Sequence, residues 1–209
     1  TKARRVRTVA GHDNLMEFGL RRAQGKSAGI YGARSAMIGG FNGTSNVLAG
    51  AKFGMPVLGT MAHSWVMSFS SELEAFRQYA KQYPNNLILL ADTYNTLKQG
   101  VPDAITIFKE MKEAGTLPKV YGIRLDSGDL AYLSKEAHKM FTAAGFPDAV
   151  IAASNDLDEN LIFELKGQGS AINSWGVGTN LITAKDSPSL GGVFKLVGQY
   201  DDGKFVPKI

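Results

Sequence analysis

The sequence predicts an α/β fold, and more specifically an irregular parallel α/β barrel of the TIM type. Short apolar runs alternate along the chain with amphipathic segments, and Gly, Asp, Ser or Thr marks each junction. Successive apolar runs begin roughly 25 to 35 residues apart, a spacing typical of right-handed βα crossovers. The 209 residues are 44% hydrophobic, which is enough for one buried core. We therefore expect residues 1–209 to form most of one α/β-barrel domain.

The clearest βα unit begins at Val57 and Leu58, which we predict to be a strand. The turn Gly59-Thr60-Met61-Ala62-His63-Ser64 follows and places His63 where a helix begins. That helix is expected over about 65 to 83, because apolar side chains recur there on one face. His63 is therefore either a simple helix cap or an exposed imidazole beside free helix amides. The second position suits a histidine that carries a phosphoryl group.

Four further apolar runs repeat this pattern along the rest of the chain. The strands are expected at Leu87–Ala91, Val120–Leu125, Ala149–Ala153 and Ala171–Trp175. The helices after the first three are expected over about 102 to 114, up to about 144 and up to about 166. Separately, Gly39–Asn46 predicts a turn that opens a small-residue helix at Val47, and Gly203–Ile209 predicts the second arm of a hairpin.

Composition excludes several classes of function. A net charge of +4 and a pI near 9.2 allow anionic ligands, but the basic residues are dispersed rather than gathered into a stripe for nucleic acid. The chain has no cysteine, which excludes a thiolate nucleophile and a cysteine-bound metal and favours a reducing compartment. No apolar run approaches the roughly 20 residues of a membrane span. We expect a cytoplasmic protein that binds neither nucleic acid nor membrane.

Polar residues follow each predicted strand, and the carboxyl ends of barrel strands share one rim. The rim should gather His63, Asp92-Thr93, Arg124–Asp129, Ser154–Asp156 and Gly176–Thr179. Asp, Ser and Thr are also the preferred helix caps, and capping alone explains Thr93 or Asp156. Capping does not explain Arg124, which interrupts an otherwise apolar strand.

The richest cluster on this rim is Arg124-Leu125-Asp126-Ser127-Gly128-Asp129. Strand alternation puts Arg124 and Asp126 on one side, where the arginine can stack on a planar ring or pair with a carboxylate. Asp126 can accept hydrogen bonds from sugar hydroxyls, and Asp126 with Asp129 can hold Mg²⁺. A purely structural ion pair between Arg124 and Asp126 is the alternative.

Two other segments are weaker candidates. Gly176-Val177-Gly178-Thr179-Asn180 is either a phosphate cradle or a tight turn. Glu17–Gln24 joins an aromatic residue to two arginines, which suits an aromatic carboxylate, phosphates or simply a solvated helix face. His12 is expected in a loop and His138 on a solvated helix face, so the histidines do not predict a metal site.

Seven motifs, taken in order, resemble those of the nicotinate phosphoribosyltransferase family. They are Glu17–Gln24, Gly43–Asn46, Gly59–Trp65, Leu90–Tyr94, Arg124–Leu130, Ala153–Leu157 and Trp175–Asn180. The resemblance covers essentially the whole chain and implies a type II phosphoribosyltransferase barrel that works as a homodimer with a shared active site. It also implies flanking amino-terminal and carboxyl-terminal segments that are absent from this chain.

The resemblance implies ATP-coupled transfer of the phosphoribosyl group from phosphoribosyl pyrophosphate to nicotinate. The products are nicotinate mononucleotide and pyrophosphate, in the salvage route to NAD, with ATP and Mg²⁺ as cofactors. His63 matches the residue that ATP phosphorylates transiently. The other residues match substrate contacts: Phe18 and Arg124 the pyridine ring, Arg21 its carboxylate or the phosphates, Asp126 the ribose, and Ser154, Asn155, Gly178 and Thr179 the 5′-phosphate.

Ser45 bears on the choice of substrate. The related nicotinamide enzyme resembles this turn but has an aspartate there, whereas a neutral hydroxyl does not repel a carboxylate. Nicotinate is therefore favoured over nicotinamide. Nicotinamide or quinolinate phosphoribosyltransferase, and an inactive barrel fragment that serves only assembly, are the alternatives. The metal ligands stay unassigned, with Asp126 and Asp129 as candidates.

Overall fold

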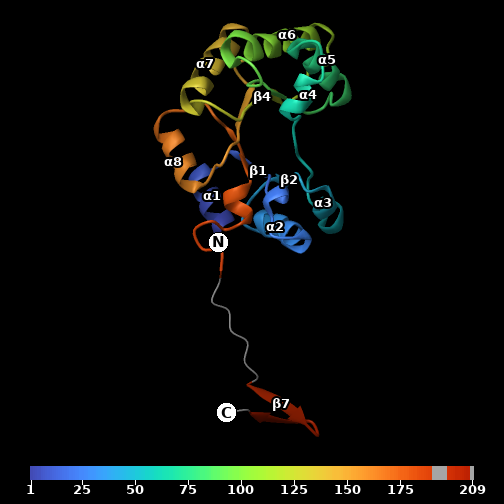
Figure 1. Cartoon of the computed structure of the whole chain (residues 1–209), viewed down its shortest axis with the longest axis vertical. Coiled ribbons are helices and arrows are strands. Elements are labelled where there is room, and N and C mark those ends of the chain that lie inside the picture. The colour runs from blue at the N-terminus through green and yellow to red at the C-terminus, as the bar shows by residue number, and fades with distance from the viewer. Residues whose placement is uncertain (190–196, 208–209) are drawn as a thin grey trace.

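The computed structural model describes residues 1–189 and 197–207, and these residues contain a six-stranded parallel sheet surrounded by helices (Figure 1). The strands of this sheet are β1 (Asn14–Glu17), β2 (Gly43–Thr44), β3 (Leu87–Leu90), β4 (Tyr121–Leu125), β5 (Val150–Ala153) and β6 (Ser174–Val177). The α-helices are α1 (Lys2–Ala10), α2 (Lys26–Ile38), α3 (Val47–Phe53), α4 (His63–Met67), α5 (Glu72–Gln82), α6 (Val101–Glu113), α7 (Leu130–Ala143), α8 (Glu159–Gly167) and α9 (Thr179–Ile182). Two short helical segments complete the main body, the 3₁₀-helix η1 (Leu20–Arg22) and the π-helix η2 (Thr96–Gly100).

The order of the strands is that of a barrel opened along one seam. Neighbouring strands run β2-β1-β6-β5-β4-β3, so β6 pairs in parallel with β1, the first strand of the chain. The seam lies between β2 and β3, and the chain crosses it through residues 45–86, which include α3, α4 and α5. This cyclic order confirms the predicted irregular parallel α/β barrel.

Alternate side chains of each strand face opposite sides of the sheet. Leu87 and Leu89 pack with the helices in the main core, whereas Ile88 joins Met16 and Ala152 in a small cluster on the inner side. Leu58, from the segment that crosses the seam, packs against this inner cluster. The inner side is therefore the interior of the barrel.

The predicted helix over about 65 to 83 is wrong in one respect, because the structure divides it into α4 and α5. The Ser71 hydroxyl caps α5 by accepting from the Glu74 amide at 3.2 Å, and the Ser68 hydroxyl donates to the Trp65 carbonyl at 2.7 Å. Serine hydroxyls favour helix ends because they compete with the helical backbone bonds. The apolar spacing identified the buried face but not this break.

Strand positions differ from the prediction near the seam and at β6. Of Val57 and Leu58, only Val57 pairs, through a single parallel bridge to Thr44. The strand expected at Ala171–Trp175 lies at Ser174–Val177, so Gly176 belongs to a strand and not to a turn. Strands β1 and β2 were not predicted, because four and two residues show too little alternation. The other predicted strands and helices end within one residue of the observed ends.

The predicted hairpin is confirmed at the end of the chain. Strands β7 (Gly198–Asp201) and β8 (Lys204–Pro207) pair antiparallel. Asp202 and Gly203 between them have φ values of 47° and 76°, as a two-residue hairpin turn requires. Residues 208–209 of the predicted arm lie outside the described residues. Among the helices of the described chain, none has the length and apolar character needed to cross a membrane.

Candidate active site

A cavity of about 380 Å³ opens at the carboxyl ends of the strands. Strands β4, β5 and β6 end at this cavity, and α4 begins there. Its lining consists of Phe18, Arg21, Arg22, Thr60, Met61, Ala62, His63, Arg124, Asp126, Ser154, Asn155, Asp156, Gly176, Gly178 and Thr179. Every predicted catalytic or substrate-binding residue is in this lining except Ser45.

His63 is the first residue of α4, whose N-cap is Ala62. Within the described residues, the side chain of His63 makes no hydrogen bond to a helix amide. Nδ1 lies 3.2 Å from Thr93 Oγ1, and Nε2 lies 3.7 Å from an Asp126 oxygen and 3.9 Å from an Asp92 oxygen. The side chain is 37% exposed. The interpretation of His63 as a simple helix cap is therefore wrong, and the ring lies among a hydroxyl and two carboxylates.

Asp92 is a site residue that the sequence placed on the rim without assigning it a role. Its side chain is only 1% exposed. Oδ2 accepts from the Asp126 amide at 2.8 Å and from the Ser127 hydroxyl at 2.6 Å. Oδ1, which faces His63, has no hydrogen-bond partner in residues 1–189 or 197–207. Asp92 thus fixes the backbone that carries Asp126 and presents one carboxylate oxygen toward the imidazole.

Arg124 reaches the cavity from β4, where Leu90 and Ala152 of the neighbouring strands lie beside it. Its Nη1 donates to the Thr60 hydroxyl. Burial lowers the pKa of Arg124, while Asp126 and Asp92 act in the opposite direction, and a guanidinium stays charged in either case. Among the described residues the buried Nε of Arg124 has no hydrogen-bond partner, so burial leaves this donor unsatisfied.

The alternative of a structural ion pair between Arg124 and Asp126 is not supported by the contacts of the carboxylate. Asp126 Oδ1 accepts from the Ser154 hydroxyl, and Oδ2 lies toward His63. The two side chains therefore share the cavity, as strand alternation predicted, but each has its own polar neighbours.

Phe18 enters the cavity from the end of β1 and packs on glycine backbone. A Cβ on Gly176 would lie 2.5 Å from the Phe18 ring, and a Cβ on Gly178 would lie 2.9 Å from the Phe18 carbonyl oxygen. The missing side chains at both glycines therefore make room for Phe18. This packing role adds to the phosphate cradle or tight turn that the sequence motif predicts.

Glu17 holds the turn that carries Phe18 and Arg21. The residue is only 1% exposed, and its carboxylate accepts from the Gly19 amide and from the Thr44 hydroxyl, each at 2.5 Å. Burial raises the pKa of Glu17 above its usual value. No sequence signal indicated this role, because Thr44 lies far from Glu17 in the chain.

The loop after β5 supplies polar groups on another side of the cavity. Ser154 is buried, whereas Asn155 and Asp156 are exposed and have φ values of 90° and 45°. These values lie in the left-handed region that residues other than glycine rarely adopt. The loop and Thr179 line the same cavity, so hydroxyl and amide groups are present there together with the acidic residue Asp156.

Ser45 and Asp129 lie outside the cavity lining. The Ser45 amide donates to the Glu17 carbonyl at 2.9 Å, and Asp129 caps α7 by accepting from the Tyr132 amide at 3.0 Å. His12 lies in a turn and His138 is exposed on α7, as predicted. In the part of the chain that the structure describes, no cluster of three or more His, Cys, Asp or Glu side chains could hold a metal ion.

The parallel strands, the arginines and the aromatic ring at this cavity define an α/β-barrel protein with a site suited to anionic, ring-containing ligands. The model of the Nicotinate phosphoribosyltransferase (NAPRTase) family matches residues 14–195. The chain therefore belongs to this family, and the resemblance seen in its motifs is confirmed.

Curated relatives with the name nicotinate phosphoribosyltransferase align with nearly all of the chain. The Bacillus subtilis protein is 52% identical over 209 residues, which are 100% of this chain and 42% of that protein. The human protein is 34% identical over 251 residues, covering 94% of this chain and 46% of that protein. This chain thus spans less than half the length of the curated relatives it matches.

Solved structures agree with the barrel fold. The crystal structure of human Nicotinic Acid Phosphoribosyltransferase superposes with a TM-score of 0.77 at 32% identity, covering 85% of this chain and 46% of that chain. The nicotinate-nucleotide pyrophosphorylase from Pyrococcus furiosus gives a TM-score of 0.73 at 23% identity, over 88% of this chain and 46% of that chain. The second likeness shows the fold alone.

Proposed function

We propose that the protein carrying this chain catalyses ATP-coupled transfer of the phosphoribosyl group from phosphoribosyl pyrophosphate to nicotinate. The products are nicotinate mononucleotide and pyrophosphate, in the salvage route to NAD. Membership of the family and the 52% identity to the Bacillus subtilis relative support the reaction. The absence of cysteine accords with a cytoplasmic location.

The observation that carries the proposal is the position of His63 at the carboxyl ends of the strands. Its Nδ1 is held by Thr93, and Nε2 faces two carboxylates, while part of the ring is exposed at the cavity. An imidazole held in this way can take up the γ-phosphoryl group of ATP and return it. We propose that transient phosphorylation of His63 couples ATP hydrolysis to nucleotide synthesis.

In the transfer step the pyridine nitrogen attacks the anomeric carbon as pyrophosphate leaves, so the protein must position a ring and two anions. We assign the ring to Phe18 and Arg124, because both residues line the cavity. Asp126 accepts from the ribose hydroxyls and stabilises the positive charge that develops on the sugar. The reaction requires no covalent bond between the protein and the sugar.

We assign the anionic groups of the substrates to other residues of the cavity lining. Arg21 is exposed at the cavity and suits the nicotinate carboxylate or the phosphates. The 5′-phosphate is assigned to the polar groups of two loops: Ser154, Asn155, Gly178 and Thr179. Ser45 does not line the cavity, so its proposed effect on nicotinate against nicotinamide stays a prediction for a substrate panel.

Mg²⁺ fits this lining as the counter-ion of the pyrophosphate. Mg²⁺ typically takes one or two carboxylates and fills its other positions with phosphate oxygens and water. Asp126 offers such a carboxylate, whereas Asp129 is used as the cap of α7. Asp126 would therefore hold the ion, which neutralises the charge of the leaving pyrophosphate.

The test is formation of nicotinate mononucleotide, measured with and without ATP, by purified protein that carries this chain. His63→Ala should abolish the stimulation by ATP and leave the fold and some ATP-independent transfer. His138→Ala is the matched control, because His138 is an exposed helical histidine away from the cavity. ATP stimulation that survives in His63→Ala would refute the phosphohistidine.

A substrate panel and the intact mass decide between the remaining alternatives. If the protein turned over nicotinamide or quinolinate faster than nicotinate, that compound would be assigned as the substrate in place of nicotinate. An intact mass near 22.5 kDa without turnover would favour a fragment that serves only assembly. We also propose a homodimer with a shared active site, which mixed dimers of two differently inactivated chains would test through recovery of activity.

A further inference from the structure

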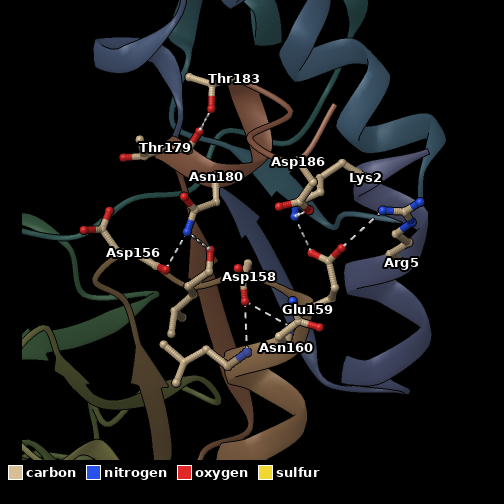
Figure 2. A network of polar contacts seen from close by, with 12 residues as sticks. Lys2, Arg5, Asp156, Asp158, Glu159, Asn160, Thr179, Asn180, Thr183 and Asp186 are labelled. Atoms are coloured by element: carbon tan, nitrogen blue, oxygen red, sulfur yellow. Dashed lines mark hydrogen bonds and ion pairs between the residues drawn. The ribbon is translucent and has the colours of Figure 1, made fainter. Parts of the chain in front are cut away.

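One buried side chain, Asn180, ties together the two loops assigned to the phosphate. Asn180 is 4% exposed and is the second residue of α9. Its Nδ2 donates to the Asp156 carbonyl oxygen at 2.6 Å and to the Leu157 carbonyl oxygen at 3.3 Å (Figure 2). The Asn180 side chain is not part of the cavity lining. It therefore links the loop after β5 to the loop after β6 from behind the cavity.

The loop after β5 has a conformation that needs such a restraint. Asn155 and Asp156 are consecutive residues with φ values of 90° and 45°. Residues other than glycine persist in this left-handed region only when the surrounding structure holds them there. Asn180 holds the carbonyl oxygen of Asp156 itself. Beyond it, Asp158 accepts from the amides at the start of α8, as Figure 2 shows, which fixes the other end of the loop.

The element that carries Asn180 is itself firmly placed. Ile182 of α9 lies so close to Gly19 and Gly32 that a Cβ there would come within 2.4 Å and 2.2 Å of it. Asp186, just after α9, pairs with Lys2, and Lys2 pairs at 2.8 Å with Glu159 at the start of α8 (Figure 2). Asn180 thus acts from a fixed helix upon a strained loop.

We propose that Asn180 is a positioning residue for the phosphate end of the cavity. It keeps Asn155 and Asp156 left-handed, so that Ser154 and Asn155 stand beside Gly178 and Thr179 around one anion. This inference rests on the proposed function, because it assigns that end of the cavity to the 5′-phosphate of phosphoribosyl pyrophosphate. Asn180 does not touch the ligand and acts only through the loop.

The kinetic test compares Asn180→Ala and Asn180→Asp in protein that carries this chain. Both variants lose the donors to the two carbonyl oxygens, and the aspartate keeps the shape of the side chain. The KM for phosphoribosyl pyrophosphate should rise about tenfold, equivalent to about 1.4 kcal/mol, while the KM for nicotinate stays within about twofold of the unmodified protein.

Asn160→Ala is the matched control. Asn160 is an exposed asparagine of α8, and its bond to Asp158 uses the backbone amide, which the substitution keeps. Both KM values should be unchanged in this control. If the KM for phosphoribosyl pyrophosphate and the KM for nicotinate rose equally in the Asn180 variants, the proposal would be overturned, because equal rises would indicate a general loss of structure.

A second substitution tests the reason for the effect. Glycine adopts positive φ without strain, so Asp156→Gly should make the loop less dependent on Asn180. In a double-mutant cycle, Asn180→Ala should raise the KM for phosphoribosyl pyrophosphate less than about threefold when Asp156→Gly is already present. An undiminished rise in that background would overturn the positioning role.

Hydrogen exchange without ligand separates this inference from the proposed function. The amides of residues 153–158 should exchange about tenfold faster in both Asn180 variants and not in Asn160→Ala, while those of the distant β3 keep their protection. If this pattern appears in a protein that makes no nicotinate mononucleotide, the proposed function fails and the restraint on the loop stands. Unchanged exchange of residues 153–158, or faster exchange throughout the sheet, would overturn the inference whatever the activity.

Discussion

At the scale of single residues, Glu72 is a buried acid that no neighbour satisfies. The residue is 0% exposed, and within the described parts of the chain neither carboxylate oxygen has a hydrogen-bond partner. Burial, with the nearby Asp103 and Asp92, raises the pKa of Glu72 from 4.5 to about 7. Between pH 4.5 and about 7 the folded form therefore holds a proton that the unfolded form releases. The contribution of Glu72 to stability is accordingly greatest below pH 4.5, and it is lost as the pH rises from there to about 7.

Glu72→Gln keeps the shape of the side chain and removes its titration. The variant should be more stable than the unmodified protein by about 1 to 3 kcal/mol at pH 8 and nearly equal to it at pH 4.5. Urea unfolding at the two pH values measures the difference. Glu164→Gln, at an exposed position of α8, serves as the control and should change neither value. A variant that is less stable at pH 8 would contradict the assignment.

The contact between Gly176 and Phe18 leads to a second prediction at this scale. Gly176→Ala adds a Cβ that would lie 2.5 Å from the Phe18 ring, so the ring must move. If Phe18 contacts the pyridine, the KM for nicotinate should rise about tenfold. Steady-state kinetics checks this against Gly167→Ala, since a Cβ at Gly167 meets no atom within 4 Å. Equal KM values in the two variants would remove Phe18 from the nicotinate site.

Residues that break a local pattern could be predicted, and residues that act through distant contacts could not. Arg124 interrupts an apolar strand, and His63 follows a short apolar run at a turn, so both are visible in a single sequence. Glu17 and Asn180 bind groups on other segments of the chain, such as the Thr44 hydroxyl and the Asp156 carbonyl. Only the folded backbone brings these groups together, and local spacing carries no signal of it.

At the scale of elements, one arginine of α1 binds the segments that precede β1 and β2. Arg7 donates to the carbonyl oxygens of Gly40, Gly11 and Asp13, and also to the Asn42 side chain, over distances of 2.7 to 2.9 Å. A guanidinium can serve these directions together because its donors form a rigid planar fork. α1 and β1 are therefore joined by more than their apolar contacts.

Arg7→Lys keeps the charge and loses the fork. The variant should lose about 1 to 3 kcal/mol of unfolding free energy, because a single ammonium cannot reach all four acceptors. Chemical denaturation checks this, with Arg4→Lys as the control on the exposed side of the same helix. If both variants lost the same unfolding free energy, the loss would come from lysine in the helix and not from the missing contacts of Arg7.

The sequence predicted the long helices more accurately than the short strands and the start of α5. Long amphipathic segments such as α6 and α7 ended within one residue of the prediction, because many turns of helix share one apolar face. α5 begins at a serine cap inside an unbroken apolar period, so periodicity alone could not place its start. β2 has two residues, and its pairing depends on β1 rather than on its own composition.

At the scale of the whole molecule, β1 and β6, the first and last strands of the six-stranded sheet along the chain, pair with each other. This pairing joins the amino-terminal and carboxyl-terminal parts of the sheet into one unit. We expect the described main body, residues 1–189, to unfold in a single cooperative transition. Trp175 is a suitable probe, because it is fully buried in β6 and donates to Asp13 at 2.9 Å. In a Trp65→Phe background, its fluorescence and the far-ultraviolet circular dichroism should give the same midpoint. Two separate midpoints would contradict the single domain expected from the sequence.

The open seam of the barrel gives the two halves of the proposed chemistry different mechanical supports. Asp126 directly follows a strand in the middle of the hydrogen-bonded sheet, whereas His63 lies on residues 45–86, the segment that spans the opening between β2 and β3. The distance of 3.7 Å between His63 Nε2 and Asp126 Oδ2 therefore depends on the width of the seam. We therefore expect a partner, ligand or neighbouring segment that closes or widens the opening to change this distance more than the distances among Arg124, Asp126 and Ser154, which belong to neighbouring strands.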